Sequence, residues 1–321
     1  MVSRLSFPRL ALAALLAAPP LAALAEVPRV VADTPIAHSF AAMVLGDLGT
    51  PELLLDRGGD PHHAQLRPSQ ARAVASADLV VWSGASLAPW MDRVIDSLNT
   101  GVALDLSAVE GLHRQPFQPS VLFGNADGHD AHDDHADHDD HDHDHGDLED
   151  AIDPHLWLDP ENAAPWLSAI ATQLGTLDPA NAATYGANAA AATASIAALD
   201  ARLREILAPV GDAGLVMHHA AYGYFARAYD LNILGTVTLG DAADPGAARL
   251  AALRDALAGA TCIFPESNHA PAHVALVADG AGLRIGAPLD PAGVMLEPGA
   301  DLYARTLLSL AEAIAACVAQ P

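Results

Sequence analysis

The sequence predicts an α/β fold in which two βα lobes with parallel sheets are joined by one long backbone helix. Short runs rich in Val, Leu and Ile alternate with helical patterns in the first half of the chain and again in its last third, as they do in α/β domains. Between the two series, residues 179–209 are rich in Ala and have no internal Pro. The 321 residues, 51% of them hydrophobic, suffice for one or two full cores. Ligands of such sheets bind beyond the carboxyl ends of the strands, which places a site in the cleft between the lobes.

The first lobe is predicted to span residues 26–178. Its expected strands are short and apolar, and they occupy residues 29–33, 52–55, 78–82 and 102–106. Helical patterns between and after them cover residues 36–48, 68–76, 86–98 and a segment from about Pro160. Pro68 suits the first turn of its helix, because that position needs no N–H donor.

Residues 179–209 are predicted to form one helix that links the lobes. Roughly 28 helical residues would extend about 40 Å, enough to run along both lobes. The second lobe, residues 210–321, repeats the alternation of strand and helix. Its expected strands occupy residues 214–219, 232–239, 261–266 and 283–290. Its expected helices occupy residues 221–230, 246–260, 270–282 and about 301–318.

The N-terminal segment has the pattern of a cleaved export signal. Arg4 and Arg9 precede an apolar run over residues 10–25, which ends in a small-x-small triplet. We expect cleavage after Ala25 and a mature protein in the periplasm. A transmembrane anchor is the alternative, but a Pro-Pro pair interrupts the run before it reaches the ~20 apolar residues of a spanning helix.

Nearly half of the net charge of −25 comes from one segment, because twelve of the forty acidic residues lie between positions 127 and 150. The chain contains no Lys. Binding to nucleic acid or to an anionic membrane surface requires clustered Lys or Arg, so we expect neither partner. A cationic ligand fits this charge better. We also expect the protein to be a monomer.

Residues 127–150 read DGHDAHDDHADHDDHDHDHGDLED and predict an accessory metal-binding loop. Seven imidazoles stand among the carboxylates of this tract: His129, His132, His135, His138, His141, His143 and His145. Their spacing matches no helical face, and repulsion among the aspartates opposes compaction, so we expect a disordered loop over residues 125–150. Such ligands should bind several ions weakly and exchange them quickly, since each binding event must order the chain.

The mature chain has two cysteines, Cys262 and Cys317. An oxidising compartment favours a disulfide between them. Closing a loop of that size would stabilise the fold by roughly 4 kcal/mol in the chain-entropy model. Two separate buried thiols are the alternative, and a metal–thiolate site is disfavoured because neither cysteine has a CxxC-type neighbour.

Three histidines outside the tract stand where a strand, or the loop after it, faces the predicted cleft. They are His62 in GGDPHHAQLRPS, His155 in DPHLWLDP and His219 in VMHHAAYGYF. Asp290 in GAPLDPAG follows the last predicted strand. Three imidazoles and one carboxylate form a tetrahedral set suited to Zn²⁺. Because only neutral imidazole binds metal, affinity should decline as the pH falls through about 6.5.

The remaining histidines have plainer interpretations. His63 and His218 adjoin candidate ligands, but neighbours along a strand point to opposite faces, so we favour His62 and His219. Hydrogen-bonded or surface roles are expected for His38 and His113, and solvated roles for the i, i+4 pair on a predicted helix, His269 and His273. Glu266 is expected to accept a hydrogen bond from a ligand imidazole or to contact a membrane partner.

Four stretches of the sequence resemble one family of transport proteins. They are HHAQLRPSQARAVASADLVVWSG (62–84), DPHLWLDPENA (153–163), HHAAYGYFARAYDL (218–231) and FPESNHAPA (264–272). The resemblance is to the periplasmic zinc-binding proteins of ABC importers, the cluster A-I solute-binding proteins of the ZnuA type. It extends over essentially the whole mature chain with the motifs in the same order.

The resemblance implies a set of zinc ligands, namely His62, His155, His219 and Asp290. Manganese-binding members of the family typically have an acid at the third position, so a histidine there favours zinc. Pro61 stands where some relatives have an acid before the first ligand, and Ala220 where an aspartate often follows the third. The first departure favours Asp290 as the fourth ligand. The resemblance also implies the long inter-lobe helix, the His-rich loop before HLWL, and a disulfide between Cys262 and Cys317.

The function implied is that of a receptor, not an enzyme, which captures Zn²⁺ and passes it to an ABC permease in the inner membrane. A separate periplasmic zinc metallochaperone could load it. Three kinds of alternative remain: a zinc buffer or chaperone that relies on the tract, a relative specialised for manganese or adhesion, and a secreted zinc hydrolase. The sequence contains no HExxH motif for the last of these.

Overall fold

The computed structural model describes residues 27–117, 152–238, 253, 257 and 259–320. The predicted export signal (1–25), the His/Asp tract and most of the predicted helix 246–260 lie outside the described residues. None of the helices in the described part is both long enough and apolar enough to cross a membrane.

The first half of the described chain forms a parallel four-stranded sheet in the order β2-β1-β3-β4. The strands are β1 (Val30–Ala32), β2 (Glu52–Leu53), β3 (Leu79–Trp82) and β4 (Val102–Asp105). Four helices accompany them: α1 (Pro35–Leu45), α2 (Pro68–Ser76), α3 (Pro89–Leu98) and α4 (Ala163–Leu177). The predicted strands and helices of this lobe are all present.

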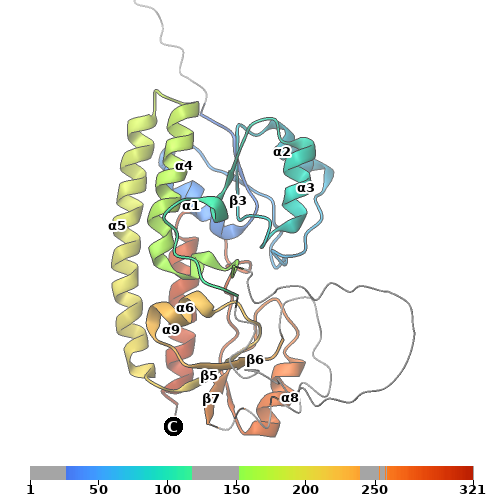
Figure 1. Cartoon of the computed structure of the whole chain (residues 1–321), viewed down its shortest axis with the longest axis vertical. Coiled ribbons are helices and arrows are strands. Elements are labelled where there is room, and N and C mark those ends of the chain that lie inside the picture. Colours follow the sequence, from blue (N-terminus) through green and yellow to red (C-terminus); the bar gives the residue numbers. More distant parts are fainter. Residues whose placement is uncertain (1–26, 118–151, 239–252, 254–256, 258, 321) are drawn as a thin grey trace, which may run out of the picture.

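Alternating side chains of β3 divide the core of this sheet into two layers. Leu79 and Val81 belong to the buried cluster that includes α1 and α4, whereas Val80 and Trp82 pack in a separate cluster with α2 and α3. Figure 1 shows α1 and α4 on one side of β3 and α2 and α3 on the other. Successive side chains of a strand point to opposite faces, so a continuous apolar run is buried on both sides. Helices α1, α2 and α3 each begin with proline in the first turn, where its missing N–H costs no hydrogen bond.

The second half forms another parallel four-stranded sheet, in the order β6-β5-β7-β8. Its strands are β5 (Gly214–Met217), β6 (Ile233–Thr236), β7 (Ala260–Ile263) and β8 (Arg284–Ile285), and the helices beside it include α6 (Gly223–Tyr229) and α8 (Ala272–Ala281). The two sheets thus have the same strand order. The predicted fold class, two parallel-sheet lobes with a long helix, is confirmed.

Strand β8 is much shorter than the predicted strand over residues 283–290. A Cβ atom on Gly286 would lie 2.2 Å from a ring carbon of Phe264, so the backbone there runs directly against the aromatic ring. Only one further bridge, between Glu266 and Leu289, continues the pairing with β7. This bridge brings Glu266 beside Asp290.

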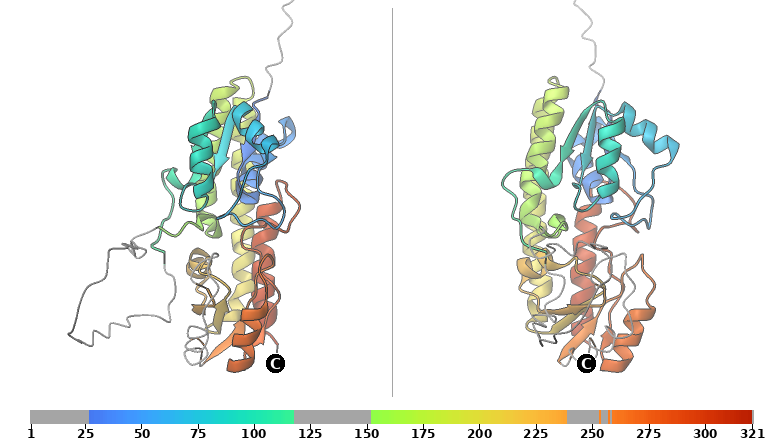
Figure 2. Two further views of the ribbon diagram at one scale, coloured as in Figure 1. Left: turned by 90° about the vertical axis from the view of Figure 1, so that its right-hand side faces the viewer. Right: turned by 45° about the vertical axis from the view of Figure 1, so that its right-hand side comes forward.

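Helix α5 (Ala182–Leu207) runs beside both sheets (Figures 1 and 2). Its 26 residues extend about 39 Å, in agreement with the predicted linking helix. Helix α9 (Leu302–Val318) lies against α5 and contacts both α1 and β7. One buried cluster therefore continues from Phe40 of the first lobe to Leu215 of the second.

A disulfide joins Cys262 of β7 to Cys317 of α9, which confirms the predicted pairing and excludes two separate thiols. Both residues are fully buried. The bond links β7 of the second sheet to the C-terminal helix α9, and α9 also contacts α1 of the first lobe.

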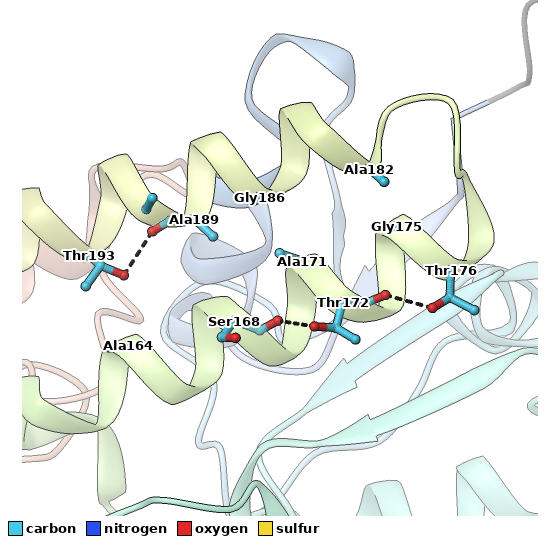
Figure 3. Close-up of a pocket in the computed structure, with 11 residues that line it drawn as sticks. Ala164, Ser168, Ala171, Thr172, Gly175, Thr176, Ala182, Gly186, Ala189 and Thr193 are labelled. Carbon is cyan, nitrogen blue, oxygen red and sulfur yellow. Dashed lines mark hydrogen bonds between the residues drawn. The ribbon is translucent and has the colours of Figure 1, made fainter.

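Helices α4 and α5 leave a surface groove of about 540 Å³ between them, lined by Gly, Ala, Ser and Thr (Figure 3). The hydroxyl groups of Thr172, Thr176 and Thr193 donate to carbonyl oxygens of their own helices. The lining includes no charged side chain. This groove therefore has none of the ligand chemistry that the sequence predicts.

Candidate metal centre

Three histidines meet where the two lobes face each other. His62 lies in the loop after β2, His155 directly precedes the short 3₁₀ helix η3 (Leu156–Leu158), and His219 follows β5. Each can offer one ring nitrogen such that all three nitrogens lie within 4.8 Å of one another. Among the described residues, no other group of three or more His, Cys, Asp or Glu side chains comes together in this way.

The three imidazoles line a cavity of about 20 Å³. That volume is close to the minimum that one water molecule needs. The cavity is therefore of a size that suits a single ion. The ring centroids of His62 and His219 each lie 5.5 Å from that of His155, so His155 is the central member of the group.

Asp153 fixes the ring of His155. Its Oδ1 atom lies 2.8 Å from Nδ1 of His155 and also accepts the backbone N–H of that residue at 3.0 Å. A carboxylate on Nδ1 selects the tautomer whose Nε2 carries no proton. Nε2 of His155 is buried and has no hydrogen-bond partner among the described residues, so it is the ring nitrogen suited to bind metal.

Burial lowers the pKa of His155, and the nearby His219 and His62 lower it further, against the opposite influence of Asp153. The ring therefore stays neutral to a lower pH than an ordinary histidine. Because a neutral ring is the form that binds metal, this environment keeps His155 ready to act as a ligand at pH values near neutrality.

Glu266 fixes His219 in the same manner. Its Oε1 atom lies 2.5 Å from Nδ1 of His219 and accepts a hydrogen bond from the hydroxyl group of Tyr222 at 3.1 Å. Glu266 is only 3% exposed. Two of the three imidazoles thus have a buried carboxylate on Nδ1, which leaves Nε2 as the nitrogen directed to the cavity.

Two hydrogen bonds hold the backbone at His62. Its N–H donates to Oδ1 of Asp60 at 2.8 Å, and the preceding carbonyl, that of Pro61, accepts from the indole of Trp90 at 2.9 Å. The side chain of His62 is half-buried, in contrast to the buried His155 and His219. It is the ligand candidate that faces the solvent side of the cavity.

Asp290 lines the same cavity without joining the group of histidine nitrogens. Its two carboxylate oxygens accept backbone N–H groups of Val294 and Met295 at 3.0 and 2.9 Å. Burial raises the pKa of Asp290, the charge of Glu266 adds to this effect, and the backbone N–H groups oppose it. A cation in the cavity would favour the charged form of this buried carboxyl.

The neighbouring histidines take other positions. His63 is exposed. His218 does not join the triad, as we call the group of His62, His155 and His219, and instead stacks on His269 at a ring separation of 4.7 Å. His38 is hydrogen-bonded through Nε2 to the carbonyl of Pro51 at 3.0 Å, and Nδ1 of His113 lies 3.0 Å from Asp159. Both of these last residues are hydrogen-bonded, as expected.

Two residues of the cavity region were missed by sequence reasoning. Asp153 stands two positions before His155, and this Asp-x-His spacing is the signal that could have identified it. His269 was expected to be solvated on a helix with His273, but α8 begins only at Ala272 and His269 lies in the loop before it, where it lines the cavity. That expectation was wrong, because the helix starts later than the pattern indicates.

The sequence matches the family described as ZnuA, zinc-uptake complex component A periplasmic, over residues 30–317. It is 47% identical over 317 residues to the high-affinity zinc uptake system protein ZnuA of Paracoccus denitrificans, a match that covers 96% of this chain and 97% of that protein. The protein of the same name from Brucella suis is 34% identical over 302 residues, with 88% and 89% covered.

Solved structures agree in fold. A crystal structure of ZnuA superposes with a TM-score of 0.72 at 23% sequence identity, covering 91% of this chain and 100% of that chain. Fold, histidine cluster and sequence similarity all lead to one conclusion. The chain belongs to the ZnuA family of periplasmic zinc-uptake components.

Proposed function

We propose that this protein captures Zn²⁺ with His62, His155 and His219, completes the coordination with Asp290, and delivers the ion to the inner-membrane permease of an ABC importer. The observation that supports this most directly is the cluster of three imidazole nitrogens within 4.8 Å around a cavity sized for one ion. Membership in a family of transport components sets aside the hydrolase alternative.

The donor set favours zinc. Imidazole nitrogen and one carboxylate suit Zn²⁺, whereas Mn²⁺ prefers sites rich in oxygen. Tetrahedral Zn–N bonds of about 2.0–2.1 Å place ligand nitrogens about 3.4 Å apart. The three nitrogens already lie within 4.8 Å of one another, so small side-chain movements would reach that geometry. The carboxylates of Asp153 and Glu266 limit those movements to the direction that keeps Nε2 toward the ion.

For the export signal, the two lobes and the linking helix, we propose the boundaries that the sequence predicts. The export signal is cut after Ala25, residues 26–178 and 210–321 form the two lobes, and residues 179–209 link them. The continuous core along α5 and α9 supports a small motion of the lobes rather than a wide closure. The mature protein acts as a monomer, and a periplasmic metallochaperone could load it.

In this proposal the His/Asp tract is an accessory that gathers zinc near the cleft. Deleting residues 128–145 should therefore leave the tightest site intact and remove only weaker, additional ions. Isothermal titration with Zn²⁺ measures both the affinity and the number of ions bound. The control is a variant that combines the deletion with His155→Ala, which should lose tight binding as well. If the deletion alone removes the tightest site, the protein is a zinc buffer that relies on the tract.

Asp290 is proposed as the ligand whose withdrawal releases the ion. Its oxygens are already engaged by the backbone of residues 294–295, so a shift of that loop would move the carboxylate from the cavity. Asp290→Asn keeps the shape but removes the charge, and it should accelerate zinc release about tenfold. Asp290→Ala should accelerate release at least as much.

Stopped-flow mixing of the zinc-loaded protein with a chelator measures this rate. Asp301→Asn is the matched control, because Asp301 lies at the other end of the same loop, and its side chain is 72% exposed and paired with Arg305. Release from the Asp290 variants no faster than from the parent would remove Asp290 from the ligand set.

A further inference from the structure

His269 stands beside the triad in a position that its sequence pattern does not predict. It lies in the loop between β7 and α8 and lines the same cavity as His62, His155 and His219. Its side chain is 21% exposed, compared with 4% for His155 and 6% for His219. Its ring centroid lies 6.4 Å from that of His219. His269 is thus an imidazole between solvent and the buried ligands.

Glu266 connects His269 to the triad. Its Oε2 atom lies 3.8 Å from Nε2 of His269, while its Oε1 atom holds Nδ1 of His219 at 2.5 Å. Zinc bound tetrahedrally to one imidazole nitrogen and one carboxylate oxygen, at about 2.0–2.2 Å each, holds these two atoms about 3.4 Å apart. A slight movement of the partly exposed His269 side chain would shorten the observed 3.8 Å to this distance. The pair therefore provides two zinc donors next to a ligand of the triad.

We propose that His269 Nε2 and Glu266 Oε2 bind Zn²⁺ transiently as it passes between solvent and the three histidines. Water completes the coordination of the ion at this stage. The triad imidazoles then replace the water molecules and His269 in turn, Asp290 replaces Oε2 of Glu266, and zinc remains divalent throughout. Glu266 keeps Oε1 on His219 during the exchange, so the transient ion lies adjacent to its next ligand. This inference rests on the triad being the zinc site.

The stack with His218 keeps His269 at this place. Their rings lie 4.7 Å apart with an interplanar angle of 29°, and His218 itself is only 5% exposed. A buried partner on one side and the cavity on the other leave the His269 ring with a restricted range of motion. If the stack had only a structural role, replacing His269 would leave the rate of zinc transfer unchanged.

The test is the kinetics of zinc binding by the full chain, followed by stopped-flow fluorescence. Trp157 lines the cavity and its ring lies 5.3 Å from that of His155, so its emission reports arrival of the ion at the triad. His269→Ala should slow association and dissociation together, each about tenfold. A transfer ligand lowers the barrier in both directions, so the Kd for Zn²⁺ should stay within threefold of the parent value.

Two further variants make the result decisive. His269→Gln retains much of the side-chain volume and should slow the kinetics equally, which separates loss of a ligand from loss of packing. His273→Ala is the matched control, because His273 lies on the first turn of α8 and does not line the cavity. It should bind and release zinc at the parent rates.

Rates for both His269 variants within threefold of the parent rates would overturn the inference. A Kd raised by more than threefold would also overturn it, because His269 would then be a resident ligand. Failure of the parent to bind Zn²⁺ tightly would instead overturn the proposed function, and the inference with it. Titration of the parent therefore distinguishes the two failures.

Discussion

Replacing His155 with alanine should raise the Kd for Zn²⁺ by about a thousandfold or more, the largest effect of any single substitution in the protein. Loss of an outer partner of a metal ligand already costs about 10–100-fold in affinity, and loss of the ligand itself costs more. His155 is the central ring of the three, and its Nε2 is buried beside the cavity. The variant also leaves the carboxylate of Asp153 buried without its imidazole partner.

Competition titration against a chelator of known affinity measures this change. His63→Ala is the matched control, because His63 directly follows His62 but is exposed and lies outside the cavity lining. Its Kd should remain within twofold of the parent value. A His155→Ala protein that binds zinc within tenfold of the parent would show that the triad is not the tight site.

Removing the disulfide, as Cys262→Ala with Cys317→Ala, should lower the free energy of unfolding by about 4 kcal/mol. The two cysteines are 55 residues apart in sequence, and cross-linking a loop of that length reduces the conformational entropy of the unfolded chain. The bond also joins β7 to α9, the helix that contacts the first lobe. Its loss should therefore lower the stability of the whole molecule.

Urea unfolding followed by circular dichroism measures the difference between parent and variant. The parent unfolded in the presence of a reducing agent should match the double variant, which controls for effects of the alanine side chains. A loss of less than about 1 kcal/mol would indicate that the unfolded chain is already compact enough for the cross-link to matter little.

Much of the fold could be predicted because local pattern and tertiary burial agree. The run LVVW of β3 is apolar at every position and is buried on both faces of its sheet, and the proline-free stretch of α5 forms a single helix. Strand β8 was predicted too long. Gly286, directly after the strand, lies against the ring of Phe264, a contact between segments that no local pattern encodes.

The residues of the site also fall into those that the sequence could identify and those that it could not. His62, His155 and His219 could be identified as candidates because each lies next to a strand or turn and within a family motif. The structure brings them together, but it leaves Asp290 engaged by backbone N–H groups. The partnership of Asp153 with His155 is local, and its Asp-x-His spacing could have indicated it. The place of His269 depends on the direction of its side chain, which is set by packing between segments that sequence spacing does not specify.

Isothermal titration of the mature chain with Zn²⁺ and with Mn²⁺, beside the His219→Ala variant, tests whether the three imidazoles form a zinc-selective site. We expect one tight Zn²⁺ site whose affinity exceeds that for Mn²⁺ and which is lost in the variant, because a site of three imidazoles favours zinc. A parent protein that binds Mn²⁺ more tightly than Zn²⁺, or a His219→Ala variant that retains the tight zinc site, would contradict this expectation.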